Sequence, residues 1–306
     1  MDEKIKVQWL WGNYCNYNCR YCPDHLHNNQ FRLPPADQFV DAMSYLARLI
    51  RMEGKTPCFD FTGGEPTKMP FLVAGLKESS GNFGRNNRLT TNGSADLDWW
   101  KENYWFFDEI EISYHVGWAN IDHIIEVYNF LITVEDAPYV EVVVHAVNKD
   151  TEWLRAVGVY ETLKEKNINT RLKMLYSNYT TGNQYLPYKT YQWEYYYATI
   201  GKVFNAEKTA YVQEDIMPQR YRHTINALDQ IPKKEIMTKQ LMCKAGKEQL
   251  VVWHNGNVFR GWCKAGGKLG NVFEKNVELP AEDIICPFDR CKNGFDRQAT
   301  KYSSGV

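Results

Sequence analysis

Strand-like and helix-like segments alternate over residues 1–180 of this 306-residue chain. Each strand-like run is short and rich in β-branched or aromatic residues, and the segment after it has apolar residues at helical spacing. Repeats of this kind, joined by short connections, predict a parallel α/β fold with right-handed crossovers. Strands are expected at 6–12, 58–64, 87–93, 108–115, 139–148 and 169–177, and helices at 35–54, 71–79, 96–105, 120–134 and 151–167.

Polar faces on the fourth and fifth strands narrow the choice of α/β fold. Because side chains alternate between the two faces of a strand, Glu111, Ser113 and His115 share one face, and so do Glu141 and His145. A closed barrel fills its interior with branched apolar side chains, whereas polar faces favour an open or partial barrel that holds a ligand. Candidate catalytic or substrate-lining residues are therefore His115, His145, Glu111 and Glu141.

The charge balance gives no basic field that would recruit nucleic acid by charge alone. Lys and Arg number 36 and Asp and Glu number 37, a net charge of −1. No stretch approaches the ~18 apolar residues of a membrane span, and the N-terminus lacks a secretory signal. We expect a cytoplasmic protein, in which clustered cysteines indicate metal or redox chemistry more often than disulfides.

Three cysteines, Cys15, Cys19 and Cys22, follow the first strand with the spacing CxxxCxxC. Thiolates hold iron–sulfur clusters, and a four-iron cluster usually takes four of them. A local triplet leaves one iron open to a substrate or cofactor, as catalytic metal sites do. A zinc knuckle and a set of structural thiols are the alternatives.

The segment FTGGEPT follows the second strand. Its glycines, Gly63 and Gly64, allow the backbone to approach a ligand closely. The carboxylate of Glu65 can accept a hydrogen bond from an ammonium group, and Pro66 stiffens the turn. An ordinary strand-to-helix turn is the alternative.

With both motifs present, the chain resembles the radical SAM superfamily, whose signature is CxxxCxxC with an aromatic residue, here Tyr21, before the last cysteine. The resemblance implies a partial (β/α)6 TIM-like barrel and a 4Fe–4S cluster on the three cysteines. S-adenosylmethionine (SAM) would chelate the open iron, and reductive cleavage would yield a 5′-deoxyadenosyl radical. Matched SAM-binding positions are Tyr21, Gly63, Gly64, Glu65, Pro66, Asn92 in TTNG, and Ser113, although TNG is also common turn chemistry.

Four more cysteines lie near the C-terminus with the spacing C-x19-C-x22-C-x4-C: Cys243, Cys263, Cys286 and Cys291. The first two bracket a predicted β-hairpin with an Asn-Gly turn at 255–256. This segment resembles the twitch and SPASM extensions of radical SAM enzymes, which hold auxiliary 4Fe–4S clusters. Four cysteines fit one auxiliary cluster of the shorter twitch type. Four thiolates suit a structural zinc ion equally well.

These features predict three regions. Residues 1–180 form the radical SAM partial barrel, 181–240 a Tyr-rich linker or lid, and 241–306 the small auxiliary-cluster domain with its β-hairpin. An auxiliary cluster fully ligated by protein has no open iron, so it would relay electrons or accept one from a substrate radical.

The expected function is hydrogen abstraction from a small polar substrate, leading to an oxidation such as dehydrogenation or cross-linking. The polar strand faces favour such a substrate, and only about ten residues precede the cysteine loop, too few for a peptide-binding leader domain. The expected electron donor is a flavodoxin or ferredoxin. The alternatives are a peptide maturase that cross-links or epimerises a residue, and a non-catalytic zinc scaffold.

Overall fold

The computed structural model describes residues 3–10, 12–22, 27–83, 86–175, 185–201, 238–289, 291 and 293–303. Each strand and helix expected in the first part of the chain is present. The strands are β1 Lys4–Leu10, β2 Thr56–Thr62, β3 Asn87–Thr91, β4 Phe107–Tyr114, β5 Tyr139–Ala146 and β6 Thr170–Met174. The helices are α1 Ala36–Met52, α2 Leu72–Phe83, α3 Leu97–Asn103, α4 Ile121–Thr133 and α5 Asp150–Glu165.

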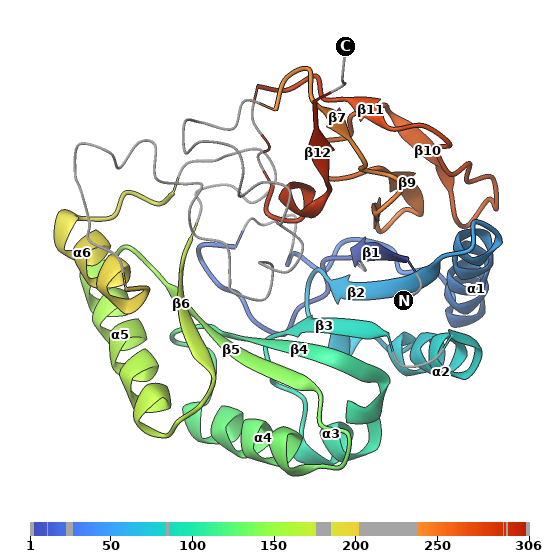
Figure 1. Cartoon of the computed structure of the whole chain (residues 1–306). Coiled ribbons are helices and arrows are strands. Elements are labelled where there is room, and N and C mark those ends of the chain that lie inside the picture. The colour runs from blue at the N-terminus through green and yellow to red at the C-terminus, as the bar shows by residue number, and fades with distance from the viewer. Residues whose placement is uncertain are drawn as a thin grey trace.

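Strands β1 to β6 are parallel and lie in sequence order in one sheet. In Figure 1 this sheet curves, with helices α1 to α5 along its outer side. The arrangement is a mixed α/β fold with a large parallel sheet, as the alternation of segments predicts. Because the strands are parallel, the loops that follow β1, β2 and β3 emerge at the same edge of the sheet.

The core lies between the sheet and the helices and follows from the strand alternation. On β1, Ile5, Val7 and Trp9 are buried, while the residues between them are not. Trp9 packs against Phe39 of α1, with ring centroids 4.9 Å apart. The buried face of α1 repeats at helical spacing, as the sequence predicts; it comprises Phe39, Ala42, Met43, Leu46, Ala47 and Ile50.

The C-terminal part of the chain extends the main sheet. The predicted hairpin is formed by β8 Gln249–Val252 and β9 Asn257–Phe259, and β10 Lys268–Asn271 follows. Strand β8 pairs in parallel with β1, so the sheet has nine strands in the order β10-β9-β8-β1-β2-β3-β4-β5-β6.

A second, three-stranded sheet has the order β11-β7-β12. Its strands are β7 Met242–Cys243, β11 Ile284–Ile285 and β12 Lys301–Tyr302. The boundaries at 180 and 240 stay predictions, because the lid segment 181–240 lies mostly outside the described residues, which include only its parts 185–201, with helix α6 Thr190–Thr199, and 238–240.

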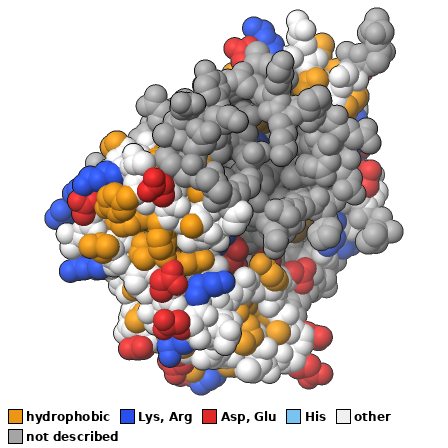
Figure 2. Space-filling model, turned by 60° about the vertical axis from the view of Figure 1, so that its left-hand side comes forward, with side chains coloured by type: hydrophobic (Ala, Val, Ile, Leu, Met, Phe, Trp, Pro, Cys, Tyr) orange, Lys and Arg blue, Asp and Glu red, His pale blue; other side chains and the backbone are white. Residues whose placement is uncertain are grey.

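Figure 2 looks onto the side of the molecule that carries α5 and α6, where hydrophobic side chains gather among charged ones. Large apolar side chains exposed on these helices include Leu154 and Tyr191. Aromatic contacts join the two helices, since Trp153 of α5 meets Tyr191 and Tyr195 of α6 edge to face. Among the helices of the described segments, none has the length and apolar character needed to cross a membrane.

A network of ion pairs covers the sheet face that is turned away from the helices. Arg88 of β3 contacts Glu111 at 3.1 Å, Glu109 at 3.4 Å and Asp60 at 3.8 Å. Since the side chains of Glu111 and Asp60 are each only 7% exposed, this guanidinium is needed to balance carboxylates withdrawn from water. The polar faces predicted from strand alternation therefore exist, and much of their charge is paired internally.

We predict that Arg88→Met destabilises the protein by about 3–5 kcal/mol, because it leaves buried carboxylates without their counter-charge. Equilibrium urea unfolding of the full chain measures this change. The matched control is Lys101→Met, which breaks an exposed pair with Asp98 and is expected to have little effect. Equal stability of the two variants would show that the network does not support the sheet.

Candidate functional site

The cysteine loop after β1 and the glycine turn after β2 contact each other through their backbones. The N–H of Gly64 donates to the carbonyl of Gly12 at 3.0 Å, and the N–H of Glu65 donates to the carbonyl of Tyr14 at 2.6 Å. A Cβ at Gly64 would lie 2.1 Å from the carbonyl oxygen of Tyr14. Only glycine allows this approach, so the turn fixes the backbone immediately before Cys15.

The side chain of Glu65 joins the glycine turn to the loop after β3. It is fully buried, and its carboxylate accepts hydrogen bonds from the hydroxyl of Thr91 at 2.7 Å and the N–H of Asn92 at 2.6 Å. The N–H and hydroxyl of Thr67 donate to it as well, at 3.0 and 2.7 Å. Burial raises the pKa of Glu65, and these hydrogen bonds oppose the rise. The carboxylate thus binds its own protein, while Gly63 and Pro66 flank it in the same turn.

Asn92 connects the loop after β3 to the cysteine loop. Its amide N–H₂ donates to the side-chain oxygen of Asn16 at 2.9 Å, and its own oxygen accepts from the N–H of Ser94. Asn16 in turn donates to the hydroxyl of Ser94. Three loops that are distant in sequence are therefore joined around Cys15. They lie close together because the parallel strands that precede them are neighbours in the sheet.

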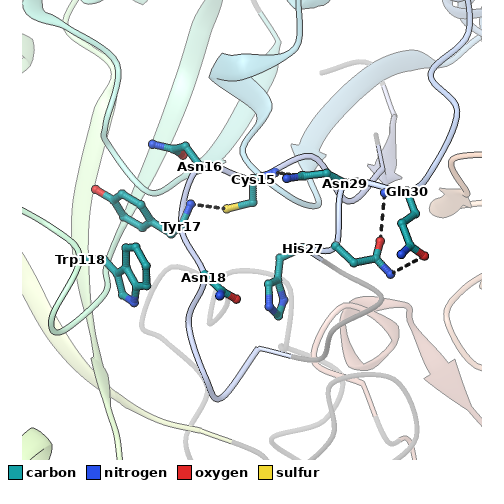
Figure 3. Close-up of a pocket in the computed structure, with 9 residues that line it drawn as sticks. Cys15, Asn16, Tyr17, Asn18, His27, Asn29, Gln30 and Trp118 are labelled. Atoms are coloured by element: carbon teal, nitrogen blue, oxygen red, sulfur yellow. Dashed lines mark hydrogen bonds between the residues drawn. The ribbon is translucent and has the colours of Figure 1, made fainter.

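The thiol of Cys15 opens into a cavity of about 600 Å³. Figure 3 shows the ring pair Tyr17 and Trp118 on one side of it and His27 on the other. The backbone N–H of Cys15 donates to Asn29 at 2.9 Å, and its sulfur accepts from the N–H of Tyr17 at 3.4 Å. The cavity gives a ligand access to this part of the cysteine loop.

Cys19 and Tyr21 meet His115, which follows the end of β4. The sulfur of Cys19 lies 3.5 Å from Nδ1 of His115, and the hydroxyl of Tyr21 lies 2.5 Å from the same nitrogen. The ring of His145, on β5, meets His115 edge to face at 4.6 Å. Of the four candidate catalytic residues, the two histidines are thus brought beside the cysteine loop. Ser113, another predicted SAM-binding residue, is buried two positions before His115.

The buried ring of His145 makes aromatic contacts but no hydrogen bond within the described residues. The residue is 5% exposed, yet neither ring nitrogen has a hydrogen-bond partner among the residues that the structure describes. Burial lowers its pKa well below the ordinary value, and the positive charges of His115 and Lys173 add to this effect. A neutral imidazole with one donor and one acceptor unused costs about 1–3 kcal/mol per unsatisfied group, which a bound ligand would recover.

The two candidate carboxylates lie in the ion-pair network. Glu111 is shared between Arg88 and Arg171, at 3.1 and 3.2 Å, and Glu141 receives a hydrogen bond from Nε of Arg171 at 2.9 Å. Both carboxylates are thus engaged by arginines. The sequence reasoning missed Arg88 and Arg171, although the alternation rule applied to the third and sixth strands would have placed them on this face.

The first cysteine cluster supplies three thiols in one short loop, the donor type that holds an iron–sulfur group. Burial raises the pKa of Cys15, and it raises that of Cys19 to about 11. Thiolates at these positions therefore need a positive partner, which iron provides. The N–H of Cys22 donates a hydrogen bond to the carbonyl of Cys19 at 2.9 Å, which forms a turn within the cysteine loop. In the described segments no three His, Cys, Asp or Glu side chains converge as ligands of one metal ion.

The second cysteine set gathers around the three-stranded sheet. Burial raises the pKa of Cys263 to about 12. The negative charges of Asp296, Cys291 and Cys243 contribute to the rise, with Asp296 the largest of the three. Burial likewise raises the pKa of Cys291 to about 11, with Cys243 and Cys286 among the smaller causes. Each of the four thiols thus lies close enough to affect the charge of another. All eight cysteines are described, and each is outside any disulfide.

Asp296 holds the loop that carries Cys263. Its carboxylate accepts the N–H of Trp262 at 2.8 Å and the N–H of Cys263 at 2.7 Å. The buried Lys301 donates to the backbone carbonyls of Asp296 and Ala299 and brings a positive charge to this region. That charge opposes the rise in the pKa of Cys243 and Cys291 that burial causes. Sequence spacing alone gave no signal for these two supporting residues.

Comparisons with known proteins identify similar folds. No protein-family model matches the chain, and no curated protein matches its sequence. The structure of native anSMEcpe with bound AdoMet has a TM-score of 0.54 and 16% identity, over 89% of this chain and 79% of anSMEcpe. Streptococcus suis SuiB bound to S-adenosylmethionine has a TM-score of 0.54 and 14% identity, over 89% of this chain.

Two further matches contain peptides. One is anSMEcpe with AdoMet and the Kp18Cys peptide, at a TM-score of 0.53 and 16% identity. The other is SuiB bound to its precursor peptide SuiA, at a TM-score of 0.54 and 15% identity. This chain spans 64% of the length of SuiB. At these identities the likeness shows a shared fold.

We predict that Gly64→Ala displaces the cysteine loop, because the new methyl group would overlap the carbonyl of Tyr14. Alkylation of the metal-free protein, followed by mass spectrometry, is expected to show faster modification of Cys15 and Cys19. Gly158→Ala is the control, since a Cβ there meets no atom within 4 Å. Unchanged alkylation in Gly64→Ala would show that the turn does not fix the loop.

Proposed function

We propose that this chain is a radical SAM enzyme. The observation that carries the proposal is the joining of three loops at one sheet edge, in which the GGEP turn and the TTNG turn position the CxxxCxxC loop through Gly64, Glu65 and Asn92. The shared fold with anSMEcpe and SuiB, both solved with SAM bound, supports it. The fold is then a partial (β/α)6 barrel.

The first cluster is assigned to the thiolates of Cys15, Cys19 and Cys22. SAM binding is assigned to the loops that these contacts join, through the backbone of the glycine turn, Asn92 and Ser113. Because the Glu65 carboxylate is buried and already accepts four hydrogen bonds, we assign it the task of shaping the turn. Tyr21, which contacts both histidines, is assigned to the boundary between SAM and substrate.

With cluster and SAM bound, the chemistry supplied is reductive cleavage of SAM to a 5′-deoxyadenosyl radical, which takes a hydrogen atom from the substrate. The chain's own part is to position the substrate and exclude water. His145 suits the first task, since its buried, neutral ring offers one N–H and one lone pair to a polar group of the substrate. The ion pairs of Glu111 and Glu141 hold the polar sheet face rigid beneath it.

We further propose that Cys243, Cys263, Cys286 and Cys291 hold one auxiliary 4Fe–4S cluster in a twitch-like C-terminal domain. Four protein thiolates would leave no iron open, which suits transfer of electrons and a net oxidation of the substrate. Asp296 and Lys301 would then act as supporting residues around that cluster. Electrons would come from a donor such as flavodoxin or ferredoxin.

Two substrate classes remain in competition. The polar sheet face favours a small polar substrate, and so does His145, whose ring nitrogens have no hydrogen-bond partner within the described ranges. A peptide is favoured by the comparison with anSMEcpe and SuiB, each of which has been solved with a peptide. Deuterium tracing separates the two, because a substrate deuterated at the reacting carbon transfers its label to 5′-deoxyadenosine. Label from peptides alone would exclude the small-substrate class, and label from small polar compounds alone would exclude the peptide class.

We predict that the anaerobically reconstituted chain binds about eight iron atoms, that Cys19→Ala binds about four, and that this variant loses SAM cleavage. The reason is that the variant lacks one ligand of the first cluster and keeps the auxiliary set intact. Iron analysis and chromatography of 5′-deoxyadenosine measure the two effects. SAM cleavage that survives in Cys19→Ala would contradict the assignment.

The non-catalytic alternative is a scaffold that binds zinc at both cysteine sets. A colourless protein with two zinc ions after reconstitution with both metals would favour that alternative. An iron-loaded protein whose spectrum changes when SAM is added would exclude it.

A further inference from the structure

Tyr21 and His115 form a pair of hydrogen-bond donors beside the sulfur of Cys19. The hydroxyl of Tyr21 and Nδ1 of His115 lie 2.5 Å apart, and Nδ1 lies 3.5 Å from the sulfur. Burial raises the pKa of Cys19, and a hydrogen bond from Tyr21 to the thiol acts against this rise. His115 Nδ1 therefore contacts both the sulfur of Cys19 and the hydroxyl of Tyr21.

The direction of these hydrogen bonds follows from the chemistry of a thiolate. A deprotonated Cys19 sulfur can only accept, so we assign the O–H of Tyr21 to it. The oxygen of Tyr21 is then an acceptor for Nδ1–H of His115. Nδ1–H is present in the protonated ring and in one neutral tautomer, and this direction holds in those two forms of His115. Both hydrogens act on the same sulfur, one directly and one through the tyrosine.

Aromatic packing holds the pair in place. The rings of Tyr21 and His115 are stacked, with centroids 5.9 Å apart and planes 10° apart. His145 meets Tyr21 at 6.0 Å and His115 at 4.6 Å, both edge to face. On its other side, His115 is met edge to face by Tyr17 at 5.9 Å. Tyr21 thus contacts two neighbouring rings and His115 three, and this packing is present without a cofactor.

We propose that Tyr21 and His115 act together as positioning residues that raise the reduction potential of the cluster held by Cys15, Cys19 and Cys22. The inference rests on the proposed function. Hydrogen bonds to cluster sulfurs favour the reduced state, because it carries more negative charge. The pair would make the electron transfer that precedes SAM cleavage easier for a donor of given potential. The CxxxCxxC motif specifies the ligands of the cluster. The effect on its potential depends in addition on His115, which follows β4.

Tyr21→Phe provides the test, because it removes the hydroxyl and retains the stacked ring. The matched control is Tyr128→Phe on the outer helix α4, whose buried hydroxyl accepts the N–H of Asn169 at 2.9 Å. Each full-length protein is reconstituted, its iron is counted, and its clusters are titrated with dithionite under EPR. The cluster of interest is recognised because its EPR signal changes when SAM is added.

We expect Tyr21→Phe to lower the ratio of reduced to oxidised cluster about tenfold at a fixed potential, a shift of about 59 mV to more negative values for one electron. His115→Leu is expected to shift it in the same direction, and His115→Asn, which keeps an N–H near the position of Nδ1, to recover most of the loss. The double variant Tyr21→Phe/His115→Leu should shift the potential by less than the sum of the single changes, because the residues act in series. Tyr128→Phe should leave it unchanged.

Two outcomes would contradict the proposed role of Tyr21 and His115 without contradicting the proposed function. One is an unchanged potential in iron-loaded Tyr21→Phe and His115→Leu. The other is loss of iron in these variants but not in Tyr128→Phe, which would assign the pair to holding the loop. Failure of the unaltered chain to bind iron at Cys15, Cys19 and Cys22 would instead overturn the proposed function, and the donor pair with it.

Discussion

The buried carboxylate of Glu65 is the interaction on which the site depends. Taking a carboxylate out of water is costly, and here the cost is offset by four short hydrogen bonds from Thr67, Thr91 and Asn92. These donors belong to the loops after β2 and β3, so satisfying Glu65 fixes the two loops together. Gly64, in the same turn, allows the close approach at which the N–H of Glu65 donates to the carbonyl of Tyr14 and fixes the cysteine loop. The geometry of three loops thus follows from one buried charge and one missing side chain.

The polar face of the sheet has two zones with different tasks. In one, Arg88 and Arg171 neutralise the carboxylates of Asp60, Glu111 and Glu141, so the charges there serve the fold. In the other, at the ends of β4 and β5, the rings of His115 and His145 lie beside the cysteine loop. In the second zone both ring nitrogens of the buried His145 lack a hydrogen-bond partner among the described residues, and we propose that the substrate binds there.

The sequence predicted the strands and helices of residues 1–180 well, because their apolar periodicity is strong and their connections are short. It also placed Glu111, Glu141, His115 and His145 on one face, because alternation along a strand is a local property. It could not divide these four residues between an ion-pair network and an open site. That division depends on Arg88 and Arg171, which come from other strands and contact the carboxylates only in the folded sheet.

The hairpin shows a similar limit. Its Asn-Gly turn was visible in the sequence, but the parallel pairing of β8 with β1 joins residues more than 200 positions apart, and no local signal encodes it.

By itself, the sequence determined the alternating fold, the two cysteine sets and the glycine turn, because each rests on spacing within a short segment. Tertiary structure alone decided that Glu65 binds its own protein, that His145 is buried with no hydrogen-bond partner in the described part of the chain, and that Tyr21 and His115 meet at Cys19. The physical reason is that each of these features depends on residues from different strands and loops. Their distances are set by sheet register and loop packing, which only the complete fold fixes.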